Sequence, residues 1–247
     1  MSMQLPTIAV FSDAHGNLMA LKKAVEMAEN LGANLFVYLG DSIGYIPSVE
    51  ALEFLRDCGK KFICVRGNHE ESILNSASEN APGLSMDSVT KHSVIRNEMT
   101  SSQLAFIQTW PTSLTATINS KNFLFVHGSP QDPLNGYVYL DSDIRLDKHL
   151  LNFDVVFVAN THIPFFKKTK GPLIVNVGSV GLPRDHGRYG SFALMNTKKS
   201  TVQISRFSIH HTQVAIMHRY KDQIHNSVYE VFDRVSEIKF FEEKNID

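Results

Sequence analysis

The first 65 residues alternate short runs of β-branched and aromatic residues with longer segments in which apolar residues recur at helical spacing. The short runs, predicted to be strands, are residues 7–11, 35–39 and 62–65. Residues 18–31 and 49–56 have the helical pattern, and Asn17 and Gly32 stand where the first helix would be capped and stopped. Strands joined by helices in this way pair in parallel, so the chain is predicted to form a largely parallel sheet.

The second half of the chain is richer in predicted strands than the first. These strands are residues 114–118, 123–126, 155–158, 173–177, 192–195 and 202–206. They imply a second sheet. Residues 70–110 have weak periodicity, broken at Pro82-Gly83, and are expected to be helical. Residues 212–241 carry apolar residues at helical intervals among many charges, which predicts one or two surface helices.

Size and charge limit the classes of function. We expect residues 1–247 to form a single domain with a C-terminal helical segment at about residues 212–247. The 24 basic and 25 acidic side chains give a net charge of -1, so no overall field would attract nucleic acid or a membrane. Nucleic acid is therefore not an expected partner, although nuclease chemistry stays open. Cys58 and Cys64 are too few for a disulfide framework and are expected to be reduced core thiols.

The N-terminus carries no basic region followed by an apolar stretch. The longest apolar run, residues 155–159, is far shorter than a membrane span. No membrane association is expected, and the expected location is cytoplasmic.

Five of the predicted strands are followed directly by His, Asp or Asn side chains. These side chains are Asp13 and His15, Asp41, Asn68 and His69, His127, and Asn160 and His162. Because open α/β sheets present their ligand sites at the carboxyl ends of strands, we expect these groups to converge. Two divalent ions about 3.5 to 4 Å apart need a bridging carboxylate, with imidazole and carbonyl oxygen completing each shell. The recurring pattern therefore predicts a two-metal site.

Each of these residues also has an ordinary structural interpretation when it is taken alone. Asp13 and Asn17 could cap the following helix while His15 lies in solvent. Asp41 could end a turn, and His127 could be a buried core histidine with satisfied hydrogen bonds. The metal interpretation is favoured because structural polar residues have no reason to recur at one strand end after another.

The blocks Asp-x-His, Gly-Asp, Gly-Asn-His-Glu, a lone His and x-x-Thr-His occur in an order and spacing that resemble those of the calcineurin-like metallophosphoesterases. The resemblance runs from residue 7 to about residue 195. Residues 40–47 and 178–185 resemble motifs of the small bacterial and archaeal phosphoesterases, and residues 66–70 are similar to the Arg-Gly-Asn-His-Glu string of Ser/Thr protein phosphatases. The resemblance implies an α/β fold (α+β in some schemes), a four-layer αββα sandwich with two central mixed sheets.

The resemblance also implies a role for each site residue. The metal ligands would be Asp13, His15 and His162 for the first ion, Asp41 as the bridge, and Asn68, His127 and Asn160 for the second ion. The catalytic residues would be Asp41 and His69, with His69 as the acid or transition-state donor. Arg66 would contact phosphate, although a surface ion pair explains it equally well. Apart from the resemblance, Tyr45, Arg184 and His186 lie on predicted loops at the same sheet edge and are either substrate-binding residues or loop surface.

Two divalent ions are the implied cofactors, with manganese favoured and iron, zinc, nickel or magnesium as alternatives. Asn160 stands where the family usually has the first His of Gly-His-x-His. An amide oxygen is a weaker and harder donor than imidazole. We therefore expect the second site to be weakened and to favour oxygen-preferring ions such as manganese.

The implied function is hydrolysis of a phosphomonoester or phosphodiester, by a phosphatase or phosphodiesterase that uses a metal-bridging hydroxide. The alternative is a catalytically weak or inactive scaffold of the same fold for protein interaction, similar to the retromer subunit. Residues 178–181 form either an ordinary turn or a phosphate-binding turn, and Lys167 and Lys168 either attract a polyanion or lie in solvent. The sequence leaves the oligomeric state and the physiological substrate open.

Overall fold

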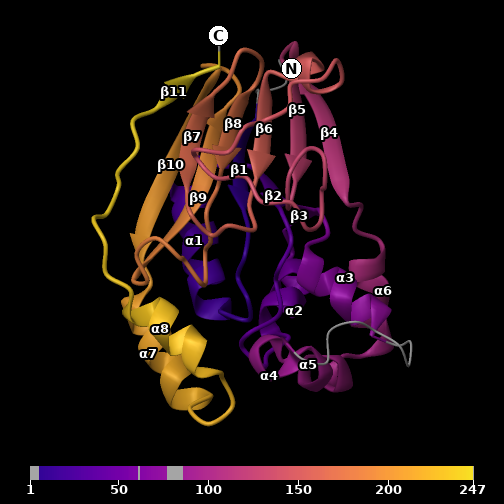
Figure 1. The fold of residues 1–247 in the computed structure, drawn as a ribbon, viewed down its shortest axis with the longest axis vertical. Helices are drawn as coiled ribbons and strands as arrows, with labels where there is room; N and C mark the ends of the chain where they lie inside the picture. The colour runs from indigo at the N-terminus through magenta and orange to yellow at the C-terminus, as the bar shows by residue number, and fades with distance from the viewer. Residues whose placement is uncertain (1–5, 61, 77–85, 247) are drawn as a thin grey trace.

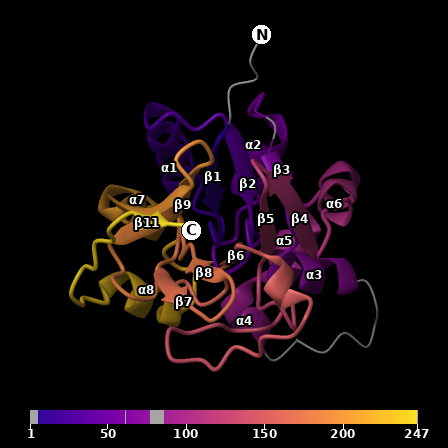
Figure 2. The same ribbon diagram turned by 90° about the horizontal axis from the view of Figure 1, so that it is seen from above.

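The computed structural model describes residues 6–60, 62–76 and 86–246. Two mixed β-sheets face each other at its centre (Figure 1). The helices of the first sheet lie on its outer face (Figure 2). In Figure 1, α3 to α5 and the pair α7 and α8 gather at the end of the sheets opposite the chain termini. The predicted Pro82-Gly83 break lies outside the described residues.

The first sheet has the strand order β11-β10-β9-β1-β2-β3. Its strands are β1 (Thr7–Phe11), β2 (Leu35–Tyr38), β3 (Phe62–Cys64), β9 (Tyr189–Asn196), β10 (Thr201–Ser208) and β11 (Lys244–Asn245). Strands β1, β2 and β3 are parallel, whereas β9, β10 and β11 pair antiparallel with their neighbours. Strands from both ends of the chain therefore share this sheet.

The second sheet has the order β4-β5-β6-β8-β7. Its strands are β4 (Ser113–Ile118), β5 (Lys121–Val126), β6 (Val155–Val158), β7 (Phe165–Lys168) and β8 (Leu173–Asn176). The central strands β5, β6 and β8 are parallel, and the two edge strands are antiparallel to them. Its outer face is covered by the segment that ends in the short 3-10 helix η2 (Leu150–Asn152).

Eight α-helices lie in the described part of the chain, and the first of them has the caps expected from the sequence. They are α1 (Leu18–Asn30), α2 (Glu50–Asp57), α3 (Asn68–Asn75), α4 (Asp87–Thr90), α5 (His92–Glu98), α6 (Ser101–Gln108), α7 (His210–Arg219) and α8 (Asn226–Asp233). Asn17 caps α1, because its side chain accepts a hydrogen bond from the N–H of Ala20. Gly32, with φ of 89°, adopts the left-handed conformation that ends such a helix.

Alternation along β1 places apolar side chains on both faces of the first sheet. Ile8 and Val10 belong to the core between the two sheets, whereas Ala9 and Phe11 pack under the helices. Phe125 and Phe157 of the second sheet fill the other side of the inter-sheet core, with ring centroids 5.1 Å apart. The core between the sheets thus fixes how the two sets of strand ends face each other.

Most predicted strands are confirmed within a few residues, but two strands were missed. β7 contains Lys167 and Lys168, which we expected to follow a loop, and β11 lies in the C-terminal segment at about residues 212–247, which we expected to be helical. The C-terminal prediction is wrong in its extent, because helix ends at Asp233 rather than continuing to about residue 241. Cys64 is buried and Cys58 is half-buried, and both are free thiols. No helix in the described part of the chain has the length and apolar character needed to cross a membrane.

Replacing Phe157 by Ala should lower the free energy of unfolding by about 3 to 5 kcal/mol, because the ring is fully buried between the sheets. Urea denaturation followed by the fluorescence of Trp110 measures this. The matched control is Phe240→Ala, because Phe240 is 77% exposed and its loss should cost no more than about 0.5 kcal/mol. Equal effects of the two substitutions would contradict the assignment of the inter-sheet core.

Candidate metal centre

The loops after five parallel strands meet at one edge of the two sheets. Asp13 and His15 follow β1, Asp41 follows β2, Asn68 and His69 begin α3 after β3, His127 follows β5, and Asn160 and His162 follow β6. All of these side chains except Asn68 are buried. The structure therefore brings together side chains that the sequence separates by up to 149 positions, from residue 13 to residue 162.

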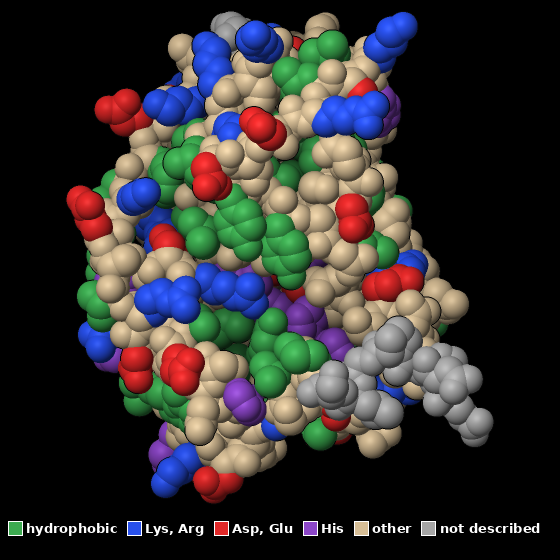
Figure 3. Space-filling view, viewed as in Figure 1, with side chains coloured by type: hydrophobic (Ala, Val, Ile, Leu, Met, Phe, Trp, Pro, Cys, Tyr) green, Lys and Arg blue, Asp and Glu red, His purple; other side chains and the backbone are tan. Residues whose placement is uncertain are grey.

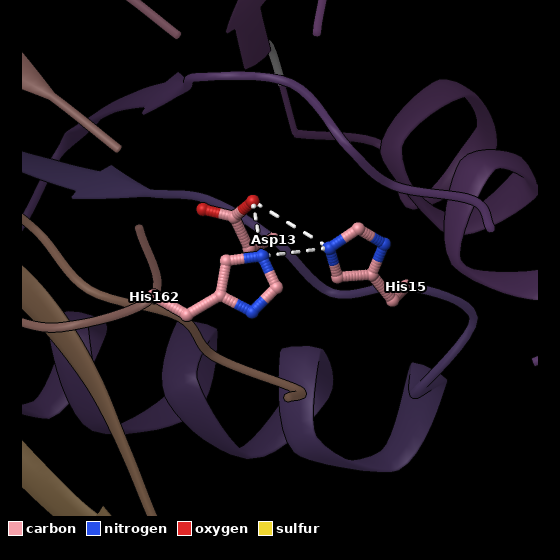
Figure 4. Close-up of side chains that lie close together, drawn as sticks. All are labelled: Asp13, His15 and His162. Carbon is pink, nitrogen blue, oxygen red and sulfur yellow. Dashed lines mark hydrogen bonds and ion pairs between the residues drawn. The ribbon is translucent and has the colours of Figure 1, made fainter. Parts of the chain in front are cut away.

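Asp13, His15 and His162 point towards one another (Figure 4). The Nε2 atom of His162 lies 3.2 Å from Oδ1 of Asp13, and the Nε2 atom of His15 lies 3.6 Å from the same oxygen. The two Nε2 atoms are 3.1 Å apart. Both carboxylate oxygens of Asp13 are buried, and neither has a hydrogen-bond partner among the described residues.

The proton positions on these two imidazoles follow from their outer partners. Nδ1 of His15 lies 3.1 Å from the carbonyl of Ile43, and Nδ1 of His162 lies 2.6 Å from the carbonyl of Leu182. A carbonyl only accepts, so each Nδ1 carries a proton, and the neutral tautomer of each ring turns the lone pair of Nε2 to the centre. Two lone pairs facing each other beside an unpartnered carboxylate are repulsive, and a bound cation would relieve this. The residues therefore fit a metal ion.

Asp41 lies between this group and a second one. Its Oδ2 atom is 3.4 Å from Nε2 of His127 and 3.7 Å from Nε2 of His15, while Oδ1 accepts a hydrogen bond from the N–H of His69 at 3.0 Å. Nε2 of His127 lies 3.0 Å from Oδ1 of Asn68, and its Nδ1 lies 2.7 Å from the carbonyl of Leu39. Asp41 thus has the position of a carboxylate that could bridge two cations.

Asn160 follows β6 and is the remaining residue that was predicted to belong to the second group. Its side-chain N–H donates to the carbonyl of Gly136 at 3.0 Å. The nitrogen is therefore occupied, and only the carbonyl oxygen of the amide is left as a ligand for a cation.

The electrostatics of the site follow from two buried carboxylates among imidazoles. Burial raises the pKa of Asp13 and of Asp41, but the facing histidines outweigh it and hold both pKa values well below the ordinary range. Burial lowers the pKa of His127, yet Asp41 and Asp13 raise it to about 10. Burial, with Arg184 nearby, lowers the pKa of His162 to about 4. The carboxylates stay charged and require a positive partner, which a proton on His127 or a metal ion supplies.

The backbone of these loops is strained. Six of the ten non-glycine residues with positive φ among the described residues lie here, namely Asp13, His15, Asp41, Tyr45, Asn160 and His162. Such conformations cost of order 1 to 3 kcal/mol each and cluster at functional sites. Hydrogen bonds between loops hold them, because the N–H of Asp13 donates to Gly40 and the N–H of His15 donates to Asp41.

Glu70 fastens two of the loops together, although it is not a candidate ligand. Its buried carboxylate accepts hydrogen bonds from the N–H groups of Asp41, Ser42 and Gly67 and from the hydroxyl of Ser42, at 2.7 to 3.0 Å. Burial raises the pKa of Glu70, and the neighbouring Asp41 adds to the shift, while the donors oppose it. Glu70 stands three residues after Gly67 at the start of α3 and makes only the glutamate half of a capping box, because glycine has no side chain to complete it.

His69 lies at the mouth of the site with its ring held on several sides. Nδ1 of His69 is 2.8 Å from Nε2 of His92, and the ring centroid of Tyr45 is 4.8 Å from that of His69. Gly44 packs against the ring so closely that any side chain there would collide with it. Nε2 of His69 faces Asp41 at 3.8 Å. His92 was not identified from the sequence, because it lies in a segment without clear periodicity.

The predicted substrate residues lie in different surroundings. The guanidinium of Arg66 donates to Glu71 at 2.7 Å and to the carbonyls of Gln108 and Trp110 at 3.0 Å, which fits its ion-pair interpretation rather than a phosphate contact. Arg184 donates to the hydroxyl of Tyr45 at 3.0 Å, beside the histidines.

The Gly-rich turn at residues 178–181 braces the loop of Asp13. The N–H groups of Val180 and Gly181 donate to the carbonyls of Ser12 and Asp13, and the Ser179 hydroxyl donates to the same Asp13 carbonyl. These donors are therefore not free to bind phosphate, so the turn is structural.

Two mixed sheets with buried Asp and His clusters at one edge define a metal-binding α/β protein of the phosphoesterase type. The model of the calcineurin-like phosphoesterase superfamily domain matches residues 7–200. The chain belongs to the calcineurin-like phosphoesterase superfamily, whose members use divalent metals to hydrolyse phosphate esters. The predicted family and fold class are confirmed.

Similar proteins agree with this assignment. The chain is 32% identical over 219 residues to an uncharacterized protein of Methanocaldococcus jannaschii, which covers 81% of this chain and 86% of the relative. A metallophosphoesterase from Sphaerobacter thermophilus superposes with a TM-score of 0.75 at 22% identity, covering 93% of this chain and 98% of that one. A hypothetical protein from Pyrococcus horikoshii gives 0.77 at 19% identity, covering 92% and 97%. At such identities the two structures share the fold with this chain.

Manganese should raise the melting temperature, and replacing Asp13 by Asn should abolish most of that rise, because the mutation removes a buried charged ligand whose oxygens have no hydrogen-bond partner among the described residues. Thermal unfolding over a manganese titration measures the shift. Asp57→Asn is the control, because Asp57 is exposed on α2 and should leave the shift unchanged. An unaltered shift in Asp13→Asn would exclude Asp13 as a ligand.

Proposed function

We propose that the protein is a dinuclear metal-dependent phosphoesterase, and that it hydrolyses phosphodiesters or phosphomonoesters. The observation that carries the proposal is the Asp41 carboxylate, which lies between one group of Asp and His ligand atoms and a second group of His and Asn atoms. A carboxylate that bridges two metal ions must lie within reach of both groups of ligand atoms.

The proposed ligand sets keep the assignments made from the sequence. Asp13, His15 and His162 hold the first ion, Asp41 bridges, and Asn68, His127 and Asn160 hold the second. Two bound divalent ions supply a nucleophile activated at neutral pH and charge neutralisation for the phosphate oxygens. We propose manganese as the metal, because Asn160 contributes a hard oxygen donor where an imidazole would favour softer ions.

His69 is the proposed donor to the leaving-group oxygen. Burial lowers the pKa of His69, so the ring is neutral and has a single N–H. The carboxylate of Asp41 faces Nε2, which favours the proton on that atom. Nδ1 is then an acceptor, and the N–H of His92 donates to it. His92 is a positioning residue in this proposal, because it keeps the proton of His69 on the side of the metal centre.

Arg184 and Tyr45 form the proposed substrate-facing edge. The hydroxyl of Tyr45 holds the guanidinium of Arg184 at 3.0 Å, and the Tyr45 ring lies 4.8 Å from the ring of His15. A guanidinium fixed in this way suits a phosphate oxygen. Arg66 is left out of the proposal because both terminal nitrogens of its guanidinium already donate to Glu71 and to backbone carbonyls.

Wild-type protein should hydrolyse bis-p-nitrophenyl phosphate or p-nitrophenyl phosphate in a manganese-dependent way, and Asp41→Asn should lose at least about 100-fold in kcat because the bridge is gone. Asn160→His should reach half-maximal activity at lower manganese, since imidazole is the stronger donor. Release of p-nitrophenolate over a manganese titration measures both. Activity that appears only in Asn160→His would support a scaffold that has lost catalysis.

His92→Ala should lower kcat by about 10- to 100-fold on phenyl phosphate, with a smaller loss on p-nitrophenyl phosphate, because a good leaving group needs less proton donation. His92→Gln is the matched control, since its amide can still donate to His69. Steady-state kinetics with the two esters measures the ratio. Equal losses on both esters in His92→Ala would mean that His92 only supports the fold.

A further inference from the structure

Two tyrosines lie side by side on the loop that borders the metal centre. In residues 136–140 the side chain of Val138 is buried against the second sheet, whereas Tyr137 is 51% exposed and Tyr139 is 44% exposed. Residues two apart in an extended segment share a face, so Val138 anchors the segment and turns both tyrosines outwards. Large aromatic rings are costly to leave in water, and a pair of them on one face indicates a binding surface.

The two rings are arranged to receive a flat group. Their planes are within 7° of parallel and their centroids are 6.2 Å apart. Figure 3 shows His side chains recessed beside hydrophobic side chains, with Lys or Arg side chains next to them. Parallel aromatic faces stack well on another aromatic ring, whatever polar atoms its edge carries.

Contacts tie this segment to the candidate metal site. Gly136 accepts a hydrogen bond from Asn160 at 3.0 Å, immediately before Tyr137. Tyr139 also lines a cavity of about 740 Å³ that lies beside β7 and the C-terminal segment and has none of the proposed metal ligands in its wall. The hydrogen bond from Asn160 to Gly136 is therefore the contact that places the tyrosine segment at the border of the site.

We infer that Tyr137 and Tyr139 form a stacking platform for a planar aromatic group joined to the phosphate, so that the substrates are phosphate esters of the nucleoside type. The inference rests on the proposed function, since the phosphate is placed at the metal centre. Arg184, held by Tyr45, stands at the same edge to contact the phosphate. The cavity beside Tyr139 carries apolar side chains, such as Phe166 and Phe240, that would suit an aliphatic chain, but the two parallel rings favour a planar group.

The test compares two ligands that differ only in the base. Adenosine 5′-monophosphate and ribose 5-phosphate are titrated by calorimetry into the manganese-loaded protein, with KM replacing Kd if either is hydrolysed. Adenosine 5′-monophosphate should bind roughly tenfold more tightly, the ratio expected for stacking of one base. The Tyr137→Ala, Tyr139→Ala double variant should reduce the ratio to near one. The Tyr137→Phe, Tyr139→Phe variant keeps both rings and should retain it.

Equal binding of the two ligands to the wild type, or a ratio unchanged in the double alanine variant, would overturn the platform. Octyl phosphate binding more tightly than adenosine 5′-monophosphate, with loss in the double alanine variant, would also overturn it in favour of an aliphatic group. A base preference without manganese-dependent turnover would leave the platform standing and reject the proposed hydrolysis. Manganese-dependent turnover without a base preference would reject the platform alone.

Discussion

The buried carboxylate of Glu70 is the interaction on which the arrangement of the site depends. It accepts hydrogen bonds from N–H groups in the loop after β2 and in the loop after β3, including that of Asp41 itself. These N–H groups are buried, and each would cost about 1 to 3 kcal/mol if it were left unpaired. The hydrogen bond from the Asp41 N–H to Glu70 holds the Asp41 backbone at its strained φ of 58°. The Asp41 carboxylate can therefore face two sets of ligand atoms. Glu70 therefore positions the proposed bridge by hydrogen bonding to the backbone N–H of Asp41.

The site is also divided between two sheets, so its geometry depends on how they pack. Asp13 and Asp41 follow strands of the first sheet, whereas His127 and His162 follow strands of the second. The aromatic and aliphatic layer between the sheets sets the spacing of the two halves, and close-packed interiors deform little. Hydrogen bonds between residues that follow strands of different sheets fix the geometry further, such as the one between His127 and the carbonyl of Leu39. The packing of the core between the sheets therefore constrains the geometry of the site.

Local patterns predicted much of the fold and the membership of the site, but not its contacts. β1 and α1 were predictable because apolar periodicity and the Asn17 cap are local features. β7 was missed because its sequence, Phe-Phe-Lys-Lys, does not alternate, and its pairing with β8 forms it. The partner of His69 was equally hidden, since His92 is 23 residues away in a weakly patterned segment. The hydrogen bonds of Arg66 were hidden as well, because the carbonyls that accept them belong to residues more than 40 positions along the chain.

Asn160 connects the metal centre with the aromatic loop, which gives a reason for an amide at this position. Its N–H holds the carbonyl of Gly136, and Gly136 precedes the exposed Tyr137. An amide carries its donor and its acceptor on one carbon, so a small side chain can hold the loop and offer an oxygen to a cation at once. An imidazole also carries its two nitrogens on one carbon, but its ring is larger and directs them along more divergent lines, so the same contacts would require the loop to move outwards. In this interpretation weaker metal binding accompanies closer placement of the tyrosines to the phosphate.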